Sequence, residues 1–165
     1  MRLLTLIRHA KSSWDYPGLT DFERPLNDRG RRDAPRMAQR LARRCKPPLL
    51  LLSSPATRAV TTARLFAEAL GVDFDEVLIE PRLYEASRKT LLEVIAGLPE
   101  RRSQVLLFGH NPGLSELAHT LAACPFDELP TCAAVQLQLD IASWAKVGPG
   151  CGKLLHYGFP KDGLD

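Results

Sequence analysis

Imidazole and guanidinium side chains follow three separate apolar runs of this sequence: Arg8 and His9, then Arg58, then His110. A neutral imidazole is a competent nucleophile toward phosphorus, and guanidinium groups bind phosphate oxygens. These residue types together are typical of a phosphoryl-transfer pocket in which His9 carries the phosphoryl group covalently. Taken alone, an Arg-His pair after an apolar run more often means only that the strand ends in a basic surface loop.

Each of these side chains is expected near the carboxyl end of a buried strand. The apolar runs that precede them have the length of strands buried on both faces of a parallel sheet: Leu3–Ile7, Leu49–Leu52 and Gln104–Phe108. Ligands of open α/β sheets bind at the carboxyl ends of the strands. If the three strands are neighbours, side chains far apart in the sequence meet at one edge of the sheet.

Helical patterns alternate with these strands. The expected N-cap residues are the polar side chains that precede the periodic apolar segments: Asn27, Ser54 and Asn111. Pro55 and Pro112 are expected at the first positions of the second and third of these helices. The helix after Asn27 is predicted to run to about residue 44, with a bend because Pro35 lies inside it.

The remaining strands are weaker and define the rest of the sheet. They are predicted over Glu76–Glu80, Ala133–Leu139 and Lys153–Tyr157, with Gln136 on a wetter face of the second. No clear helix separates the last two, so they are expected to be antiparallel at an edge. The alternation predicts an α/β fold, a three-layer α/β/α sandwich with a mainly parallel central sheet.

The composition is that of a soluble globular protein, with 165 residues, of which 45% are apolar and 25% charged. Without repeats or linkers, residues 1–165 are expected to form a single domain, with a loose tail over Lys161–Asp165. The net charge of +3 and the absence of a long apolar run indicate neither a nucleic-acid nor a membrane partner. The four dispersed cysteines predict reduced thiols and a cytoplasmic location. His110 and His119 lie nine residues apart, a spacing without metal-ligand character, and no metal or other cofactor is expected.

Basic residues are concentrated in one segment: Arg29, Arg31, Arg32, Arg36, Arg40, Arg43, Arg44 and Lys46. The favoured interpretation is a solvated face of the helix that follows Asn27. A docking surface for an acidic protein is the alternative.

Four short motifs resemble those of the histidine phosphatase superfamily, which includes the phosphoglycerate mutases. They are Arg8-His9-Ala10, Arg24–Gly30, Ser54–Ala63 and Gly109–Pro112. The second is most similar to the small phosphohistidine phosphatases of the SixA type. The resemblance implies a phosphoglycerate mutase-like fold, with His9 as nucleophile and Arg8, Arg58 and His110 around the phosphate. Ala10 stands where the family usually has glycine.

Four further residues are candidates for the site. Arg24 matches an additional arginine of the SixA-type pocket, or alternatively fixes its loop from the surface. Lys11, close to His9 in the sequence, and Asn111 are assigned to substrate binding. Glu85 follows the third strand and is the candidate proton donor, with a solvated loop carboxylate as an equal alternative.

The favoured function is a phosphatase for phosphohistidine on proteins, because only one predicted helix lies between Glu85 and Val105 and leaves the site open. A phosphatase of small sugar or nucleotide phosphates is the alternative, made specific by Arg24 and the loop 12–21. A phosphate-sensing module without catalysis is the non-enzymatic alternative, and mutase activity is the least favoured. The expected partner is a phosphorylated protein or a small phosphoester, and the enzyme is expected to be a monomer.

Overall fold

A computed structural model describes residues 1–163, so the last two residues of the predicted tail lie outside the described residues. The helices and strands alternate along the chain, with short 3-10 turns between them. In order they are β1 (Arg2–Arg8), α1 (Asp28–Ala42), β2 (Leu50–Ser53), α2 (Thr57–Leu70), β3 (Leu78–Ile79), α3 (Arg88–Ala96), β4 (Gln104–Gly109), α4 (Gly113–Leu121), β5 (Ala134–Leu139) and β6 (Gly152–Gly158).

The strands form a single sheet in the order β3-β2-β4-β1-β5-β6. The first four strands of this order are parallel, whereas β5 is antiparallel to both of its neighbours. The predicted mainly parallel sheet with an antiparallel edge is therefore confirmed. The third predicted strand is reduced to the two residues of β3. Because β2, β4 and β1 are adjacent and parallel, their carboxyl ends lie at one edge of the sheet.

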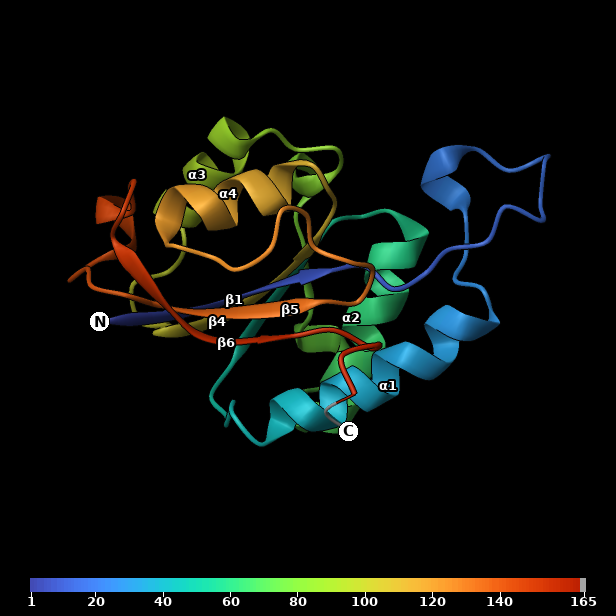
Figure 1. Ribbon diagram of the computed structural model, residues 1–165, viewed down its shortest axis with the longest axis horizontal. Helices are drawn as coiled ribbons and strands as arrows, with labels where there is room; N and C mark the ends of the chain where they lie inside the picture. Colours follow the sequence, from blue (N-terminus) through green and yellow to red (C-terminus); the bar gives the residue numbers. More distant parts are fainter. Residues whose placement is uncertain (164–165) are drawn as a thin grey trace.

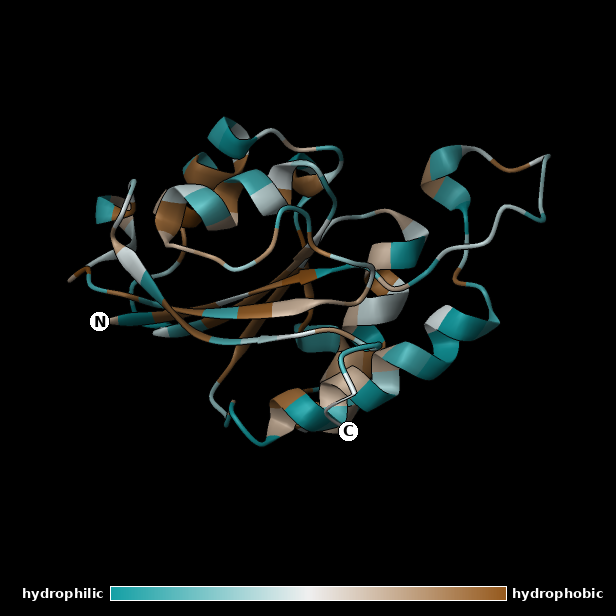
Figure 2. Cartoon of the chain, in the orientation of Figure 1, coloured by the Kyte–Doolittle hydropathy of each residue, from teal (hydrophilic) through white to brown (hydrophobic). Residues whose placement is uncertain are grey.

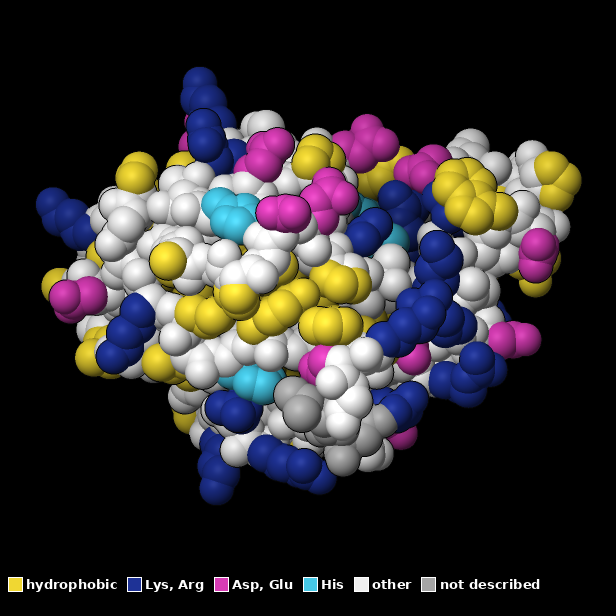
Figure 3. All heavy atoms as spheres, viewed as in Figure 1, with side chains coloured by type: hydrophobic (Ala, Val, Ile, Leu, Met, Phe, Trp, Pro, Cys, Tyr) yellow, Lys and Arg dark blue, Asp and Glu magenta, His cyan; other side chains and the backbone are white. Residues whose placement is uncertain are grey.

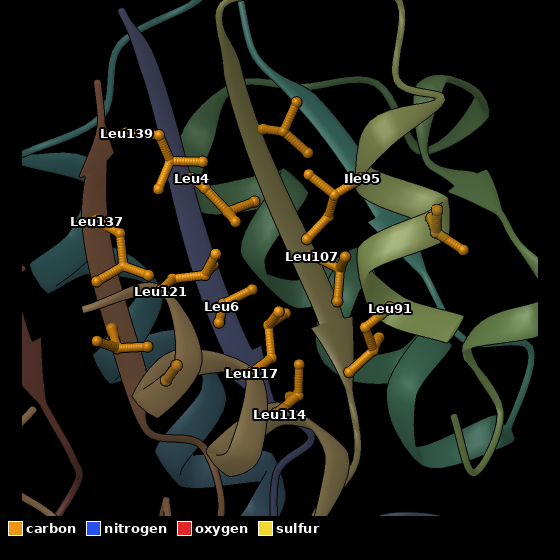
Figure 4. Close-up of a cluster of buried hydrophobic side chains, with 14 of the residues drawn as sticks. Leu4, Leu6, Leu91, Ile95, Leu107, Leu114, Leu117, Leu121, Leu137 and Leu139 are labelled. Carbon is orange, nitrogen blue, oxygen red and sulfur yellow. The ribbon is translucent and has the colours of Figure 1, made fainter. Parts of the chain in front are cut away.

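Helices cover both faces of the sheet, with α3 and α4 on one face and α1 and α2 on the other (Figure 1). Alternate strand residues point to opposite faces, so that Leu6 packs toward α3 and α4 while its neighbour Ile7 packs toward α1 and α2. Figure 4 shows the first of these two cores, where leucines of β1, β4 and β5 meet leucines of α4 and α3. Burying one such leucine side chain contributes roughly 2 kcal/mol, so the two cores hold the strand ends in place.

Asn27 is the N-cap of helix α1, as predicted, and its side chain accepts a hydrogen bond of 2.8 Å from the Gly30 backbone N–H. The helix continues through Pro35 as one element and ends slightly earlier than predicted. Helix α1 is largely hydrophilic, whereas the central strands above it in the view are largely apolar (Figure 2). A Cβ atom at Gly30 would lie 2.2 Å from the carbonyl oxygen of Lys11, so glycine allows the first turn to pack against the chain that leaves β1.

Two predicted helix caps are wrong. Helix α2 begins at Thr57 and α4 at Gly113, each one turn or less beyond the predicted start, and neither helix has a side-chain cap. The reason is that Ser54 and Asn111 use their side chains elsewhere. The Ser54 hydroxyl is hydrogen-bonded to His110. The Asn111 amide donates to the Leu129 carbonyl in a loop and accepts from the Ser115 hydroxyl in the first turn of α4.

The predicted wetter face of β5 is also wrong at Gln136, which is buried. Its side-chain N–H donates to the sulfur of Cys45 at 3.2 Å, because the chain that follows α1 covers this side of the strand. All four cysteines are unpaired thiols. Among residues 1–163, no helix combines the length and the apolar character that crossing a membrane requires.

Candidate active site

A cavity of about 340 Å³ lies at the carboxyl ends of β1, β2 and β4. Every residue that the sequence analysis placed in the site lines this cavity. The full lining is Arg8, His9, Lys11, Ser12, Trp14, Asp21, Arg24, Arg58, Glu85, His110, Asn111 and Thr131. On the surface, His side chains lie among Lys and Arg side chains beside the projecting loop that follows β1 (Figure 3). The expected meeting of distant residues at one edge of the sheet is therefore observed.

His9 follows the last residue of β1 and is only 7% exposed. Its Nδ1 lies 2.8 Å from the carbonyl oxygen of Ala10. Because a carbonyl only accepts, Nδ1 carries the hydrogen and Nε2 keeps a free lone pair. Burial, and secondarily the charges of His110, Arg58 and Arg8, lower the pKa of His9 to about 3, against the opposing effect of the Ala10 hydrogen bond. At neutral pH the ring is therefore uncharged, with Nε2 available as a nucleophile.

His110 follows β4, and its ring centroid is 5.2 Å from that of His9. Its Nε2 is 2.7 Å from the hydroxyl oxygen of Ser54. That oxygen accepts from the Ala56 backbone N–H at 3.3 Å, so the hydroxyl hydrogen is free to be donated to Nε2. Nδ1 then carries the ring hydrogen, and it is buried without a hydrogen-bond partner among the described residues. Burial, followed by the charge of Arg58, lowers the pKa of His110 to about 4, so that this ring is also neutral.

Arg8 presents a second donor of the same kind. One of its terminal nitrogens donates to the Leu129 carbonyl at 2.9 Å, which fixes the side chain. Its Nε is buried and has no partner within the described part of the chain. A buried donor without an acceptor costs about 1–3 kcal/mol. Two such donors, Nε of Arg8 and Nδ1 of His110, belong to side chains that line one cavity, as a site built for an oxyanion requires.

Arg58 is the second residue of α2, and its guanidinium is held by Asp21. Nη1 donates to the Asp21 carbonyl at 2.7 Å and Nη2 to the carboxylate at 3.0 Å. The same carboxylate accepts from Arg24 at 2.9 Å and from the Tyr84 hydroxyl at 2.7 Å. These bonds, that of Tyr84 foremost, lower the pKa of Asp21 to about 2, and the pKa of Tyr84 rises to about 12. Asp21 is thus a carboxylate that orients two arginines.

Asp21 belongs to the site but was not among the residues predicted for it. It lies in a loop without periodicity, and the loop folds so that the acid reaches a helix far along the chain. The only available signal was its position three residues before Arg24, the spacing at which the two side chains form their ion pair.

Arg24 is buried, and each of its nitrogens already has an acceptor in the protein. Nε donates to the Ser13 carbonyl at 3.0 Å, and the other two nitrogens donate to Asp21 and to the Ser12 hydroxyl. The guanidinium carbon also lies 3.3 Å from the centroid of the Trp14 ring. Arg24 therefore holds the loop together while its charge remains at the wall of the cavity.

The remaining predicted residues differ in how firmly they are held. The Asn111 amide donates to the Leu129 carbonyl at 2.8 Å and accepts from the Ser115 hydroxyl at 2.7 Å, so it braces the wall beside Arg8. Glu85 is exposed and adopts the left-handed backbone conformation, with φ of 51°. Lys11 is half-buried at the cavity. No group of three or more His, Cys, Asp or Glu side chains within residues 1–163 is arranged to hold a metal ion.

Comparison with known proteins places this geometry in a family. The model of the histidine phosphatase superfamily (branch 1) matches residues 4–112. An uncharacterised chloroplast protein of Arabidopsis thaliana is 36% identical, over 93% of this chain and 75% of its own length. An uncharacterised protein of Mycobacterium tuberculosis is 32% identical, over 94% of this chain and its whole length.

Solved structures agree with this placement. A crystal structure from Agrobacterium tumefaciens, assigned as a SixA phosphohistidine phosphatase, superposes with a TM-score of 0.77 at 29% identity, covering 96% of this chain and 98% of that one. The protein histidine phosphatase SixA in complex with tungstate has a TM-score of 0.79 at 22% identity, over 96% and 97% of the two chains. A mycobacterial glucosyl-3-phosphoglycerate phosphatase has a TM-score of 0.67 at 18% identity, over 96% and 100%. The last two similarities establish the shared fold.

Proposed function

The chain belongs to the histidine phosphatase superfamily, and from this we propose that it hydrolyses phosphohistidine on proteins through a phosphohistidine intermediate on His9. The observation that carries the mechanism is the state of the His9 ring. Its Nδ1 is engaged by the Ala10 carbonyl, its low pKa keeps it neutral, and Nε2 remains free in a cavity lined by arginines.

In the first step, Nε2 of His9 attacks the phosphorus of the substrate. The bond from phosphorus to the leaving imidazole breaks, and its electron pair stays on the leaving nitrogen, which takes a proton from Glu85 or from solvent. Arg8, Arg58 and Nδ1–H of His110 donate to the phosphoryl oxygens as the group passes to His9. Asp21 keeps Arg58 in place for this task.

In the second step, water attacks the phosphorus of phosphorylated His9. The P–N bond breaks, its electron pair returns to Nε2, and the proton of the water passes to Glu85 or to solvent, so that inorganic phosphate leaves. In this scheme the charges on the phosphoryl oxygens are met by protein side chains, without a metal ion. Lys11, Arg24 and Asn111 are assigned to substrate binding at the wall of the cavity.

An open approach to the cavity supports a protein substrate. Between Glu85 and β4 the described chain contains only α3 and its turns, which pack on the sheet rather than over the cavity. The relative from Agrobacterium tumefaciens, assigned as a phosphohistidine phosphatase, also matches almost the full length of this chain.

The test is to compare kcat/KM for a histidine-phosphorylated protein with kcat/KM for a panel of sugar and nucleotide phosphates. We expect the phosphoprotein to be preferred by at least tenfold. A metabolite that is hydrolysed equally well or better would reject the assignment.

Hydrolysis of a small phosphoester is the second candidate. The observation that favours it is the excess of cations at the cavity, where Lys11 and Arg24 lie beyond the groups assigned to the phosphoryl oxygens. They suit a second anionic group of a small substrate, and the same panel would identify it. Turnover of nitrophenyl phosphate would distinguish both candidates from a phosphate-sensing module.

We also propose that residues 1–165 form one domain that acts as a monomer in the cytoplasm. Two cores that share the faces of one sheet and the four unpaired cysteines support this assignment.

A further inference from the structure

The loop between β1 and α1 projects from the body of the protein beside the cavity (Figure 1). We call residues 13–27 the arm. Four of its large apolar side chains are exposed: Trp14 at 75%, Tyr16 at 54%, Leu19 at 39% and Phe22 at 39%. Exposed apolar side chains that gather on one segment mark interaction sites more often than the same number scattered singly.

The arm is tied to the rest of the protein at its base and near its 3-10 turn, although it lies outside the cores. Thr20 and Glu23 form a capping box around the 3-10 turn Asp21–Glu23, and a backbone bridge joins Ser12 to Leu26 at the base of the arm. The ring of Phe22 packs edge-on against Tyr84 with centroids 5.1 Å apart, next to the contacts of Asp21 already described. These contacts hold the arm beside the cavity while its apolar side chains stay exposed. A surface that is already in place before binding lowers the entropic cost of binding a partner.

The arm is continuous with the proposed catalytic cavity, because Trp14 lines that cavity. On its other side a groove of about 380 Å³ separates the arm from the first turn of α1, with Tyr16 and Leu26 among its walls. Tyr16 and Leu19 lie outside the cavity lining. A metabolite confined to the cavity therefore leaves them uncovered, whereas a protein that delivers a phosphoryl group to His9 can cover them.

We propose that the arm is the docking site for the folded protein that presents its phosphorylated side chain to His9. Tyr16 and Leu19 contact an apolar surface next to the phosphorylated residue, and Trp14 lies between this contact and the cavity. The inference rests on the proposed function and adds to it the surface that selects the protein.

The experiment uses the double variant Tyr16→Ser with Leu19→Ser, neither of which lines the catalytic cavity. Folded proteins are phosphorylated on histidine with phosphoramidate, and the one that the wild type hydrolyses best is compared with free phosphohistidine. We expect KM for the phosphoprotein to rise at least tenfold with kcat unchanged, because interface aromatic residues commonly carry this much binding energy. Turnover of free phosphohistidine should stay within twofold. Phe74→Ser is the matched control, because it removes an aromatic ring that is 52% exposed, about as much as Tyr16, but lies outside the arm. It should leave the turnover of both substrates unchanged.

Each alternative has a distinct result. Unchanged phosphoprotein turnover by the double variant overturns the docking site, and so does an equal loss on free phosphohistidine, which would mean that the arm shapes the cavity. Docking along α1 instead predicts that Arg32→Glu with Arg43→Glu impairs phosphoprotein turnover while the arm variant does not. If the wild type hydrolyses nitrophenyl phosphate but no phosphoprotein, the proposed function is wrong and the docking site with it.

Discussion

The hydroxyl of Ser54 lies 2.7 Å from Nε2 of His110 and so leaves the ring hydrogen on Nδ1, which is buried and has no partner among the described residues. The two residues come from the segments after β2 and β4, which are neighbours only in the folded sheet. Replacing Ser54 with alanine removes this control, so that Nδ1 is no longer held as the donor. We expect kcat/KM for nitrophenyl phosphate to fall about tenfold to a hundredfold, since loss of a donor to a transition state costs up to about a thousandfold.

Ser53→Ala is the matched control for Ser54→Ala. Ser53 is equally buried, but its hydroxyl donates to the Ser54 carbonyl rather than to a ring of the site. Its removal should change kcat/KM less than threefold. Wild-type activity of Ser54→Ala would show that His110 keeps its orientation without the hydroxyl.

His9→Ala should abolish turnover of every substrate, because the proposed phosphoryl acceptor is missing. In the wild type, quenching during turnover should trap phosphate on His9 that is labile in acid and stable in base. Mass spectrometry locates it, and circular dichroism checks that the variant is folded. His119→Ala, at an exposed histidine of α4, serves as the control and should keep full activity. Substantial turnover by His9→Ala would exclude the covalent mechanism.

The pH dependence of the activity should reflect the low pKa values of the two histidines, His9 and His110. Protonation of His9 removes the lone pair of Nε2, so activity requires a pH above its pKa. Because the pKa of His9 is about 3, kcat/KM should stay high well below the ordinary histidine pKa of 6.5 and fall only below about pH 4. Protonation of His110, whose pKa is about 4, leaves the hydrogen on its Nδ1 in place. The measurement is kcat/KM from pH 3.5 to 8, corrected for ionisation of the substrate. An acid limb centred near 6.5 would contradict the burial argument.

Asp21→Asn keeps the shape of the side chain and removes the charge that holds Arg58 and Arg24. We expect KM for nitrophenyl phosphate to rise about tenfold and tungstate to bind more weakly, because loss of one hydrogen bond to a charged group costs roughly 1.5–3 kcal/mol. Asp15→Asn, at an exposed acid of the same arm, should leave both unchanged. Tighter tungstate binding in Asp21→Asn would mean instead that the carboxylate competes with the phosphoryl group for Arg58.

Gly30→Ala tests the contact between α1 and the chain that leaves β1. The new methyl group would lie 2.2 Å from the Lys11 carbonyl oxygen, so backbone must move. The free energy of unfolding should fall by about 1–3 kcal/mol, as overpacked sites generally show. Gly18→Ala places its methyl group in open space and should stay within about 0.5 kcal/mol of the wild type. Denaturant titration measures both, and equal stability of the two variants would contradict the contact.

Much of the arrangement was predictable because buried parallel strands carry a strong local signal. Each of these apolar runs is followed within a few residues by a reactive side chain, and parallel neighbours bring such segments together. The meeting of His9 with His110 thus follows from short-range patterns and one topological rule. The resemblance of the motifs to those of the histidine phosphatase superfamily then supplied an expected role for both histidines.

The unpredicted features all depend on contacts between distant segments. Asp21 reaches Arg58 because the arm folds back toward α2. Ser54 has a favourable side chain for a helix cap, but the partner that it bonds is His110. Gln136 is buried since the chain after α1 covers that side of β5. In each case local preference is overridden by a tertiary partner that a single sequence does not reveal.

The polarity of the sheet leaves the two ends of the molecule unequal. All the proposed chemistry lies where β1, β2 and β4 finish, whereas the amino terminus emerges at the opposite end, with Met1 71% exposed (Figure 1). A fusion partner, dye or solid support attached at Met1 would lie at the end of the molecule opposite the cavity. The enzyme can thus be immobilised through Met1 with its cavity and arm facing the solution.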